Sequence, residues 1–146
     1  MELYTIGFAQ KSAREFFRLL NEHGVKQLVD IRIHPQGQLA GFARQEDLPY
    51  FLAELAGGCR YLYLPALAPT PELLKEYRQD KDWERYLARF DALMQARDIP
   101  AALDRSIFET LPSCLLCSEP TPEHCHRRLV AERLASHWPG LAVIHL

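Results

Sequence analysis

The chain has 146 residues and 48% of them are hydrophobic, so it can build a single folded domain over residues 1–146. Its 17 lysines and arginines and 19 aspartates and glutamates give a net charge of −2, which argues against nucleic-acid binding driven by bulk charge. Because no apolar run has membrane-spanning length and the first ten residues lack the pattern of a signal peptide, we expect a cytoplasmic protein without a membrane partner.

The first half of the chain alternates between apolar strand patterns and amphipathic helix patterns. Ser12 and Glu15 have capping-box spacing at the start of a helix that ends near Gly24. Asp47 can cap a helix that carries Pro49 in its first turn. We therefore expect a strand at 3–6, a helix from 12 to 24, a strand at 27–32, a loop at 33–46 and a helix from 47 to about 57.

The second half continues the same alternation. Apolar residues recur at helical spacing between 82 and 97, and again at Leu103, Ile107 and Leu111 after Pro100. The expected elements are a strand at 60–64, a short helix beginning at 70, helices at 82–97 and after 100, a strand at 113–117, a helix at 123–137 and a strand at 142–146.

Alternating strands and helices, with strands that are mostly continuous apolar runs, predict a parallel sheet covered on both faces. The expected fold is a three-layer α/β/α domain with a mostly parallel sheet of about five strands. Ligands of such folds bind at the carboxyl ends of the strands. The polar residues that follow the strands are therefore the first candidates for a binding site.

The densest chemical signal lies between Cys114 and Arg127. A cysteine at a helix N-terminus, beside arginine and histidine, can have a lowered pKa and act as a nucleophile. Cys117 or Cys125 is the candidate nucleophile, with His126 as acid or base and Glu119 orienting it. The competing structural interpretation is that Cys125 and His126 only cap the helix.

A small metal site is a further interpretation of this segment, since Cys117, His124, Cys125 and His126 are types of residue that bind zinc. Cys114 and Cys117, however, are three apart on a predicted strand and point to opposite faces. The spacing is also uncommon for zinc, so we assign no metal ligands and expect Cys114 to be a buried apolar residue.

Asp30 and Arg32 end the second predicted strand, and the period of two places them on the same side of it. Three roles fit such a pair. Arg32 can hold a buried Asp30 as a structural ion pair, it can bind an anionic substrate, or Asp30 can orient Arg32 toward an anion. The loop that follows carries Gln38 between two glycines, a weak signal for close contact with a ligand.

Aromatic residues and one late histidine have structural explanations. Trp83, Tyr86 and Phe90 have the spacing of core packing rather than of a surface on which nucleic-acid bases stack. His145 on the last strand is expected to be a satisfied strand histidine rather than a catalyst.

These motifs resemble the DUF488 family of small α/β proteins, whose function is not established. The segments that carry the resemblance are Thr5-Ile6-Gly7, Val29-Asp30-Ile31-Arg32, Gly41-Phe42, Tyr63-Leu64-Pro65 and Cys114 through Arg127. Many members have Thr-Ile-Gly-His-Ser where this chain has Phe8-Ala9, so it is similar to a subgroup with Thr-Ile-Gly-Phe. The resemblance implies the fold and a shared site.

We therefore expect an enzyme-like site that binds an anionic ligand, either a nucleotide or a nucleic-acid phosphate, at the carboxyl edge of the sheet. The alternative is a ligand-sensing or interaction module without catalysis, in which the same residues form a structural polar network. A homodimer is compatible with the sequence. The candidate ligand-binding residues are Thr5, Gly7, Phe8, Asp30, Arg32, Gln38 and Arg127, and the candidate catalytic residues are Cys117, Glu119, Cys125 and His126.

Overall fold

One parallel sheet forms the centre of the protein in the computed structural model, which describes residues 1–36 and 41–146. Its five strands pair in the order β3-β2-β4-β1-β5, and every pairing is parallel. The strands are β1 (Glu2–Gly7), β2 (Gln27–Asp30), β3 (Arg60–Tyr63), β4 (Ser113–Cys117) and β5 (Ala142–His145). This confirms the predicted α/β fold with a five-stranded parallel sheet.

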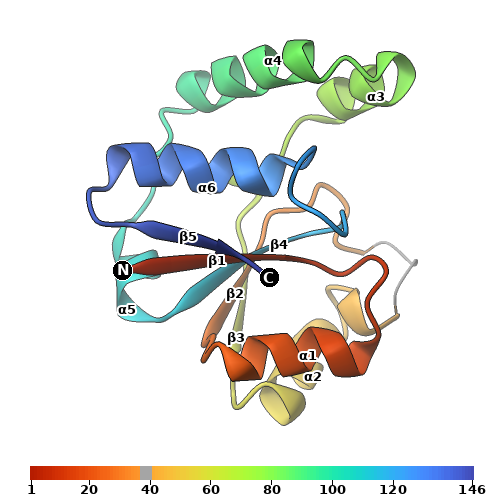
Figure 1. Ribbon diagram of the computed structural model, residues 1–146, viewed down its shortest axis with the longest axis vertical. Helices are drawn as coiled ribbons and strands as arrows, with labels where there is room; N and C mark the ends of the chain where they lie inside the picture. Colours follow the sequence, from red (N-terminus) through yellow and green to blue (C-terminus); the bar gives the residue numbers. More distant parts are fainter. Residues whose placement is uncertain (37–40) are drawn as a thin grey trace.

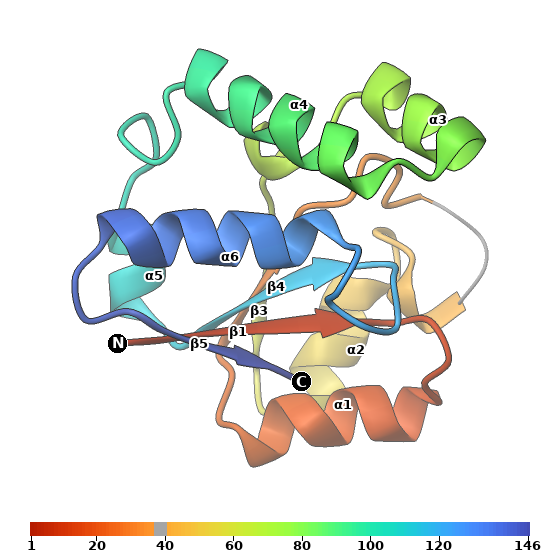
Figure 2. The ribbon, with the colours of Figure 1, turned by 45° about the horizontal axis from the view of Figure 1, so that its top comes forward.

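Helices cover both faces of the sheet (Figures 1 and 2). Helices α1 and α2 lie on one face, and α6 lies on the other, with α3 and α4 farther out on that side. The helices are α1 (Ala13–Glu22), α2 (Leu48–Leu55), α3 (Pro71–Asp80), α4 (Trp83–Ala96), α5 (Ser106–Thr110) and α6 (His126–His137). Among the described residues, no helix is both long and apolar enough to cross a membrane.

Two apolar clusters, one on each face, hold the helices to the sheet. Alternation along β4 sends Leu115 into the cluster that includes Val130 of α6, and sends Cys114 into the cluster that includes Phe16 of α1. All five residues of β4 are buried, whereas the edge strands β3 and β5 are partly open. The continuous apolar pattern of β4 thus reflects a central strand that is covered on both sides.

Two local predictions need correction. The helix expected after Pro100 is confined to the five residues of α5, because the side chain of Asp104 accepts hydrogen bonds from the backbone and hydroxyl of Ser106 and turns the chain there. Asp47 does precede α2, but its carboxylate does not cap the helix and instead pairs with Arg44 at 2.7 Å.

Two further boundaries differ at the carboxyl edge of the sheet. Strand β2 ends at Asp30 rather than at Arg32, because the Asp30 carboxylate accepts a hydrogen bond from the Arg32 backbone and bends the chain. Helix α6 begins at His126 rather than at residue 123, because Cys125 is extended and acts as its N-cap. Both differences place polar side chains in loops beyond the strand ends.

The arrangement of β1 and β4 determines where a ligand site is expected. These strands are neighbours, and Gly7 pairs with Cys117 at their carboxyl ends. The chain continues from β1 into α1 on one face and from β4 into α6 on the opposite face (Figure 2). A crevice opens where successive connections leave a parallel sheet in opposite directions, and such crevices are the usual ligand sites of open α/β sheets.

Candidate functional site

A cavity of about 490 Å³ lies at this edge of the sheet. Its wall includes Arg32 beyond β2, Cys117 at the end of β4, and Cys125 and His126 at the start of α6. Helix α3 and the residue after it contribute the exposed cations Arg78 and Lys81 at the mouth. The sequence analysis did not select these two cations, because they lie in a charged run of mixed sign that is typical of a solvated helix face.

Two thiols meet at the floor of the cavity. The Sγ atoms of Cys117 and Cys125 lie 2.7 Å apart, and both side chains are almost completely buried. Cys117 comes from the end of β4, whereas Cys125 is the N-cap of α6 and its Sγ accepts a hydrogen bond from the Arg127 backbone at 3.5 Å. The expected helix-capping role of Cys125 is therefore real, and it also brings this thiol to its partner.

Arg127 is the largest fully buried side chain of the site, and it lies behind the thiols rather than on the cavity wall. Its Nη1 donates to the Sγ of Cys117 at 3.1 Å and to the carbonyl oxygen of Glu119, and its Nε donates to Thr5 Oγ1 at 3.2 Å. Among the described residues, Nη2 has no hydrogen-bond partner. No carboxylate of the described chain pairs with this guanidinium, so its charge requires another anion nearby.

The Cys117 sulfur is the acidic group in contact with that cation. Burial alone would raise the pKa of the Cys117 thiol, but the hydrogen bond from Cys125 and the positive charge of Arg127 outweigh it, so the pKa lies below its ordinary value. For Cys125, burial and the hydrogen bond to Cys117 both raise the pKa well above its ordinary value. The two shifts have opposite signs, so negative charge in this pair is favoured on Cys117 and the proton is favoured on Cys125.

A chain of polar contacts leads from Arg127 through β1 to the edge strand β5. Thr5 Oγ1 accepts a hydrogen bond from Arg127 and also shares a hydrogen bond with Nδ1 of His145, 2.6 Å away. Burial, and then the charge of Arg127, lower the pKa of His145 and favour its neutral form. His145 is satisfied by Thr5, as the sequence led us to expect, and the pairing of β1 with β5 places the two residues opposite each other.

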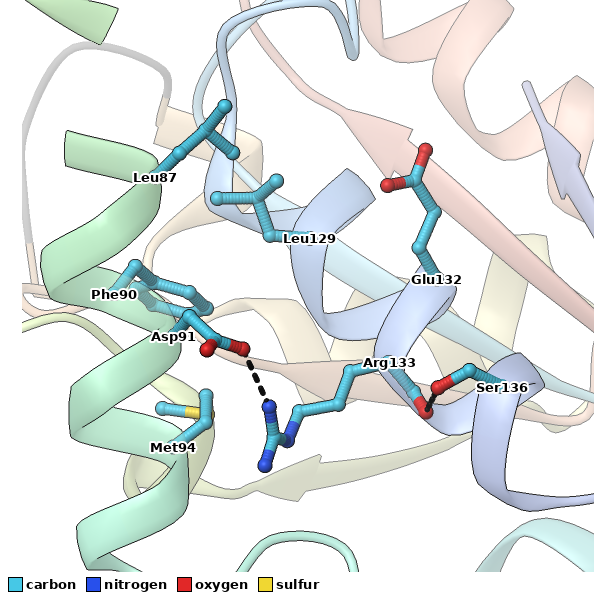
Figure 3. A pocket seen from close by; sticks show the side chains of 8 residues that line it. All are labelled: Leu87, Phe90, Asp91, Met94, Leu129, Glu132, Arg133 and Ser136. Atoms are coloured by element: carbon cyan, nitrogen blue, oxygen red, sulfur yellow. Dashed lines mark hydrogen bonds and ion pairs between the residues drawn. The ribbon is translucent and has the colours of Figure 1, made fainter. Parts of the chain in front are cut away.

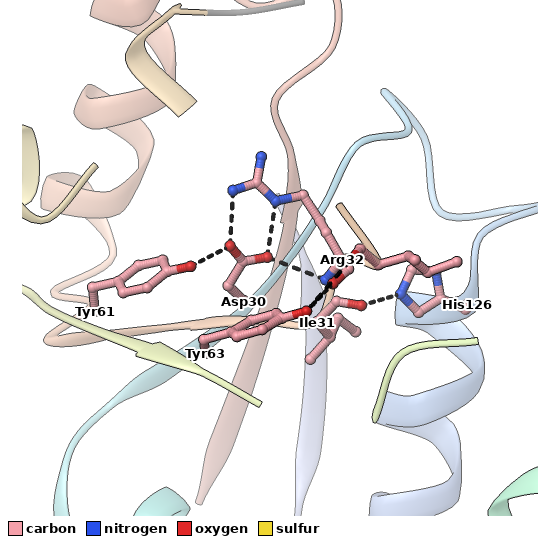
Figure 4. A network of polar contacts seen from close by, with 7 residues as sticks. Asp30, Ile31, Arg32, Tyr61, Tyr63 and His126 are labelled. Carbon is pink, nitrogen blue, oxygen red and sulfur yellow. Dashed lines mark hydrogen bonds and ion pairs between the residues drawn. The ribbon is translucent and has the colours of Figure 1, made fainter. Parts of the chain in front are cut away.

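Asp30 and Arg32 form a buried bidentate ion pair beside the cavity, as Figure 4 shows. Nε and Nη2 of Arg32 each lie 2.8 Å from a carboxylate oxygen of Asp30, which also accepts the hydroxyl proton of Tyr61 at 2.5 Å. Tyr63 donates to the backbone carbonyl of Arg32 at 3.1 Å. Figure 4 shows the third guanidinium nitrogen of Arg32 without a partner among the residues drawn, and Arg32 belongs to the wall of the cavity.

His126 lies between the thiols and this network. Its Nε2 donates to the carbonyl oxygen of Ile31 at 2.7 Å, which leaves the lone pair of Nδ1 facing Cys125 Sγ at 4.0 Å. Burial lowers the pKa of the ring to about 4, and the charge of Arg127 adds to the effect. His126 is therefore neutral at neutral pH. The carboxylate of Glu119 is exposed, and the described contact of this residue with the site is made by its backbone carbonyl.

This neutral His126 predicts a loss of stability in mild acid. In the unfolded chain the ring takes up a proton near pH 6.5, whereas in the folded protein it does so only near pH 4. The folded state binds fewer protons between these values, so the free energy of unfolding falls as the pH drops, by on the order of 2–3 kcal/mol in total. Urea unfolding of His126→Gln across this range should show a flatter pH dependence than the wild type.

The matched control is His34→Gln, which changes an exposed histidine of the same cavity. We expect its pH dependence to follow the wild type. If His126→Gln and the wild type lose stability in parallel between pH 6.5 and 4, the assignment of a buried neutral His126 is wrong.

The remaining candidate residues lie at the end of β1. Gly7 packs against the carbonyl of Glu119, and Phe8 is buried with its ring centroid 5.4 Å from the guanidinium carbon of Arg32. Lys11, which the sequence analysis missed, donates from Nζ to the Gly7 carbonyl at 2.9 Å, and burial lowers its pKa. The only feature of the sequence that could have indicated Lys11 was its position shortly after the first strand. Gln38 lies outside the described residues.

One structural observation concerns the metal site that the sequence suggested for the cysteine cluster. Within residues 1–36 and 41–146, no group of three or more His, Cys, Asp or Glu side chains is placed to hold a metal ion. Cys114 points to the α1 face of the sheet and Cys117 to the α6 face, as their spacing predicted. Each of the two cavity thiols instead contacts the other thiol.

A second cavity, of about 280 Å³, lies between α4 and α6 (Figure 3). Its wall combines apolar side chains such as Leu87 and Leu129 with polar ones such as Glu132 and Ser136. The cation of this cavity, Arg133, is neutralised by Asp91 at 2.7 Å. Its wall contains no cysteine or histidine, so of these two cavities only the one at the edge of the sheet has side chains suited to thiol chemistry.

Comparison with known proteins places the site within a wider group. A family model described as domain of unknown function DUF488 matches residues 12–134, which include β2, β4, both cavity cysteines and Arg127. No curated protein and no solved structure matches the chain. The first strand, with Thr5 and Gly7, lies before the matched segment.

Proposed function

The chain belongs to the DUF488 family, and we propose that it is a thiol-dependent enzyme acting on a small anionic substrate of the nucleotide or phosphate type. The observation that carries this proposal is the buried Arg127 guanidinium, whose Nη1 lies 3.1 Å from Cys117 Sγ with no carboxylate partner among the described residues. A cation in this position favours the thiolate, which is the nucleophilic form of cysteine.

The distribution of charge around the cavity supports an anionic substrate. Arg32 lines the cavity, and Arg78 and Lys81 lie at its mouth. Two carboxylates, Glu119 and Glu123, also line the cavity, but both belong to the loop between β4 and α6. The cations come from the segment after β2 and from the end of α3, so a bound anion would lie on that side, with its reactive centre toward Cys117.

The roles of the other candidates follow from their contacts. His126 acts as a positioning residue that joins α6 to the backbone of Ile31 and presents the lone pair of Nδ1 to the thiols. Arg127 acts through Cys117 rather than on the substrate, since it lies behind the thiols. Thr5 and Gly7 support Arg127 by a hydrogen bond and by leaving room for it.

A pair of alkylating reagents tests this proposal. Iodoacetate and iodoacetamide attack thiolates by the same chemistry, but iodoacetate is anionic. We expect Cys117 to react with either reagent roughly tenfold faster than Cys114 at pH 7, because a thiolate reacts and a buried neutral thiol does not. The double variant Arg78→Gln with Lys81→Gln should slow iodoacetate several-fold and leave iodoacetamide unchanged, because the cations at the mouth attract an anion. Peptide mass spectrometry assigns the modified cysteine.

The matched control is Arg14→Gln with Arg18→Gln. It removes the same charge from exposed positions on α1, across the sheet from the cavity. Its ratio of iodoacetate to iodoacetamide rates should equal that of the wild type. Cys117 reacting no faster than Cys114 would overturn the nucleophile, and equal ratios in both double variants would overturn the preference for anions.

A second candidate function, a ligand-sensing module without catalysis, is favoured by the Asp30 network. Two of the donor groups of Arg32 are held by Asp30, and Tyr61 and Tyr63 tie the pair to β3. Such a hydrogen-bonded network suits a rigid binding site as well as an active site. The two candidates differ in thiol reactivity, because a sensor of this kind does not need a reactive Cys117.

A further inference from the structure

The two cavity thiols form an asymmetric pair. Cys117 and Cys125 come from different elements, β4 and the N-cap of α6, and their Sγ atoms lie 2.7 Å apart. Both side chains line the cavity of about 490 Å³, although little of either is exposed. A nucleophile alone needs no second thiol in contact with it, so Cys125 calls for a role of its own.

The two sulfur atoms have different neighbours, which gives them different chemical roles. The Arg127 side chain donates to Cys117 at 3.1 Å, so negative charge is stabilised on that sulfur. Cys125 Sγ lies against Cys117 Sγ at 2.7 Å, and its other neighbour is Nδ1 of His126 at 4.0 Å. Nη2 of Arg127 is fully buried and has no hydrogen-bond partner among the described residues, so this cation depends on the negative charge of the Cys117 sulfur beside it.

We propose that Cys117 and Cys125 exchange with a low-molecular-weight disulfide, Cys117 attacking it and Cys125 completing an internal disulfide. This inference rests on the proposed nucleophile, and it adds a redox reaction with a small disulfide as the oxidant. It also assigns to Cys125 the role of the resolving thiol.

The reaction has two steps. In the first, the Cys117 thiolate attacks one sulfur of the small disulfide, a bond forms between them, and half of the reagent leaves as a thiolate. In the second, the Cys125 thiol gives up its proton to that thiolate, and its sulfur attacks Cys117 Sγ. The mixed disulfide breaks and the other half leaves as a thiolate. Two electrons pass from the protein to the reagent, which is released as one thiol, carrying the proton of Cys125, and one thiolate, which takes a proton from the solvent.

The reaction should be reversible, for an electrostatic reason. Oxidation removes the negative charge from Cys117 and leaves Arg127 buried without an anion among the described residues. Because the buried cation stabilises the reduced pair, with its negative charge on Cys117, the disulfide should be readily reduced by a small thiol.

The experiment treats the folded wild-type protein with oxidised glutathione, an anionic disulfide, and with the neutral 2-hydroxyethyl disulfide. We expect a disulfide between Cys117 and Cys125 by peptide mass spectrometry, release of two small thiols per protein, and return to the dithiol with excess reduced glutathione. Cys125→Ser should stop at a mixed disulfide on Cys117. Serine is itself a good N-cap, so this variant keeps the start of α6 intact.

The control is Cys59→Ala, which removes a buried thiol at the amino end of β3, away from the cavity, and should react as the wild type does. If the wild type stops at a mixed disulfide on Cys117, Cys125 does not resolve it, and this inference fails while the nucleophile stands. If Cys117 forms no mixed disulfide and alkylates no faster than Cys114, the proposed function fails as well.

Discussion

Replacing Gly7 by alanine is expected to destabilise the protein by about 3 kcal/mol or more, or to prevent folding altogether. A Cβ atom at this position would overlap the backbone carbonyl of Glu119 and press on Nη1 of Arg127. The obstacle is rigid backbone at the paired ends of β1 and β4, where Gly7 lies opposite Cys117. Urea unfolding measures the loss, and soluble expression reports it if the variant does not fold.

The effect should reach the chemistry as well as the stability. Arg127 holds Cys117 and the Glu119 carbonyl together, and the added methyl group of Gly7→Ala would push between them. Any folded fraction should therefore show slower alkylation of Cys117. Gly41→Ala is the control, because a Cβ atom there meets no described atom within 4 Å. A Gly7→Ala protein as stable as Gly41→Ala would mean that the packing at this strand end is wrong.

Replacing Asp30 by asparagine should cost about 3–5 kcal/mol, because it leaves the buried charge of Arg32 without a counterion. The carboxylate accepts two hydrogen bonds from the Arg32 side chain, one from its backbone and one from Tyr61, and asparagine offers a single acceptor oxygen of similar shape. Chemical denaturation of the purified variant gives the change in the free energy of unfolding.

The chain offers a matched surface pair as the control. Asp47 pairs with Arg44 at 2.7 Å, but about a third of each side chain is exposed to solvent. The same change, Asp47→Asn, should alter stability by about 1 kcal/mol or less, because solvent screens an exposed pair. Equal losses in the two variants would show that burial does not distinguish the pairs and that the Asp30 network is not what holds the end of β2.

Two buried arginines, Arg32 and Arg127, organise the site at the carboxyl ends of the strands. The Asp30 network ties β2 and β3 together and presents Arg32 to the cavity, while Arg127 ties β1, β4 and α6 around the thiols. Both arginines are buried, and each is held by several contacts. Side chains restrained in this way are pre-organised, which is what a binding or catalytic site requires.

Hydropathy patterns and residue spacing were sufficient for the fold class, the five strands and most of the helix positions. They also placed Asp30 and Arg32 on one side of the chain and Cys114 and Cys117 on opposite sides, because alternation along a strand is a local property. The short helix α5 and the early end of β2 escaped this reasoning. In both places an aspartate side chain bonds to a nearby backbone amide and competes with the regular structure.

The side-chain contacts that determine the reactivity of the site could not be derived from hydropathy patterns and residue spacing. Nothing in the spacing of Cys117 and Cys125 says that their sulfurs touch, that Arg127 lies behind them instead of in the cavity, or that Arg78 and Lys81 stand at its mouth. Tyr61 reaches Asp30 across 31 residues of sequence, and Thr5 reaches Arg127 across 122. Periodicity reports which face of an element is apolar, whereas burial, charge pairing and the protonation of a thiol depend on which elements the folded chain brings together.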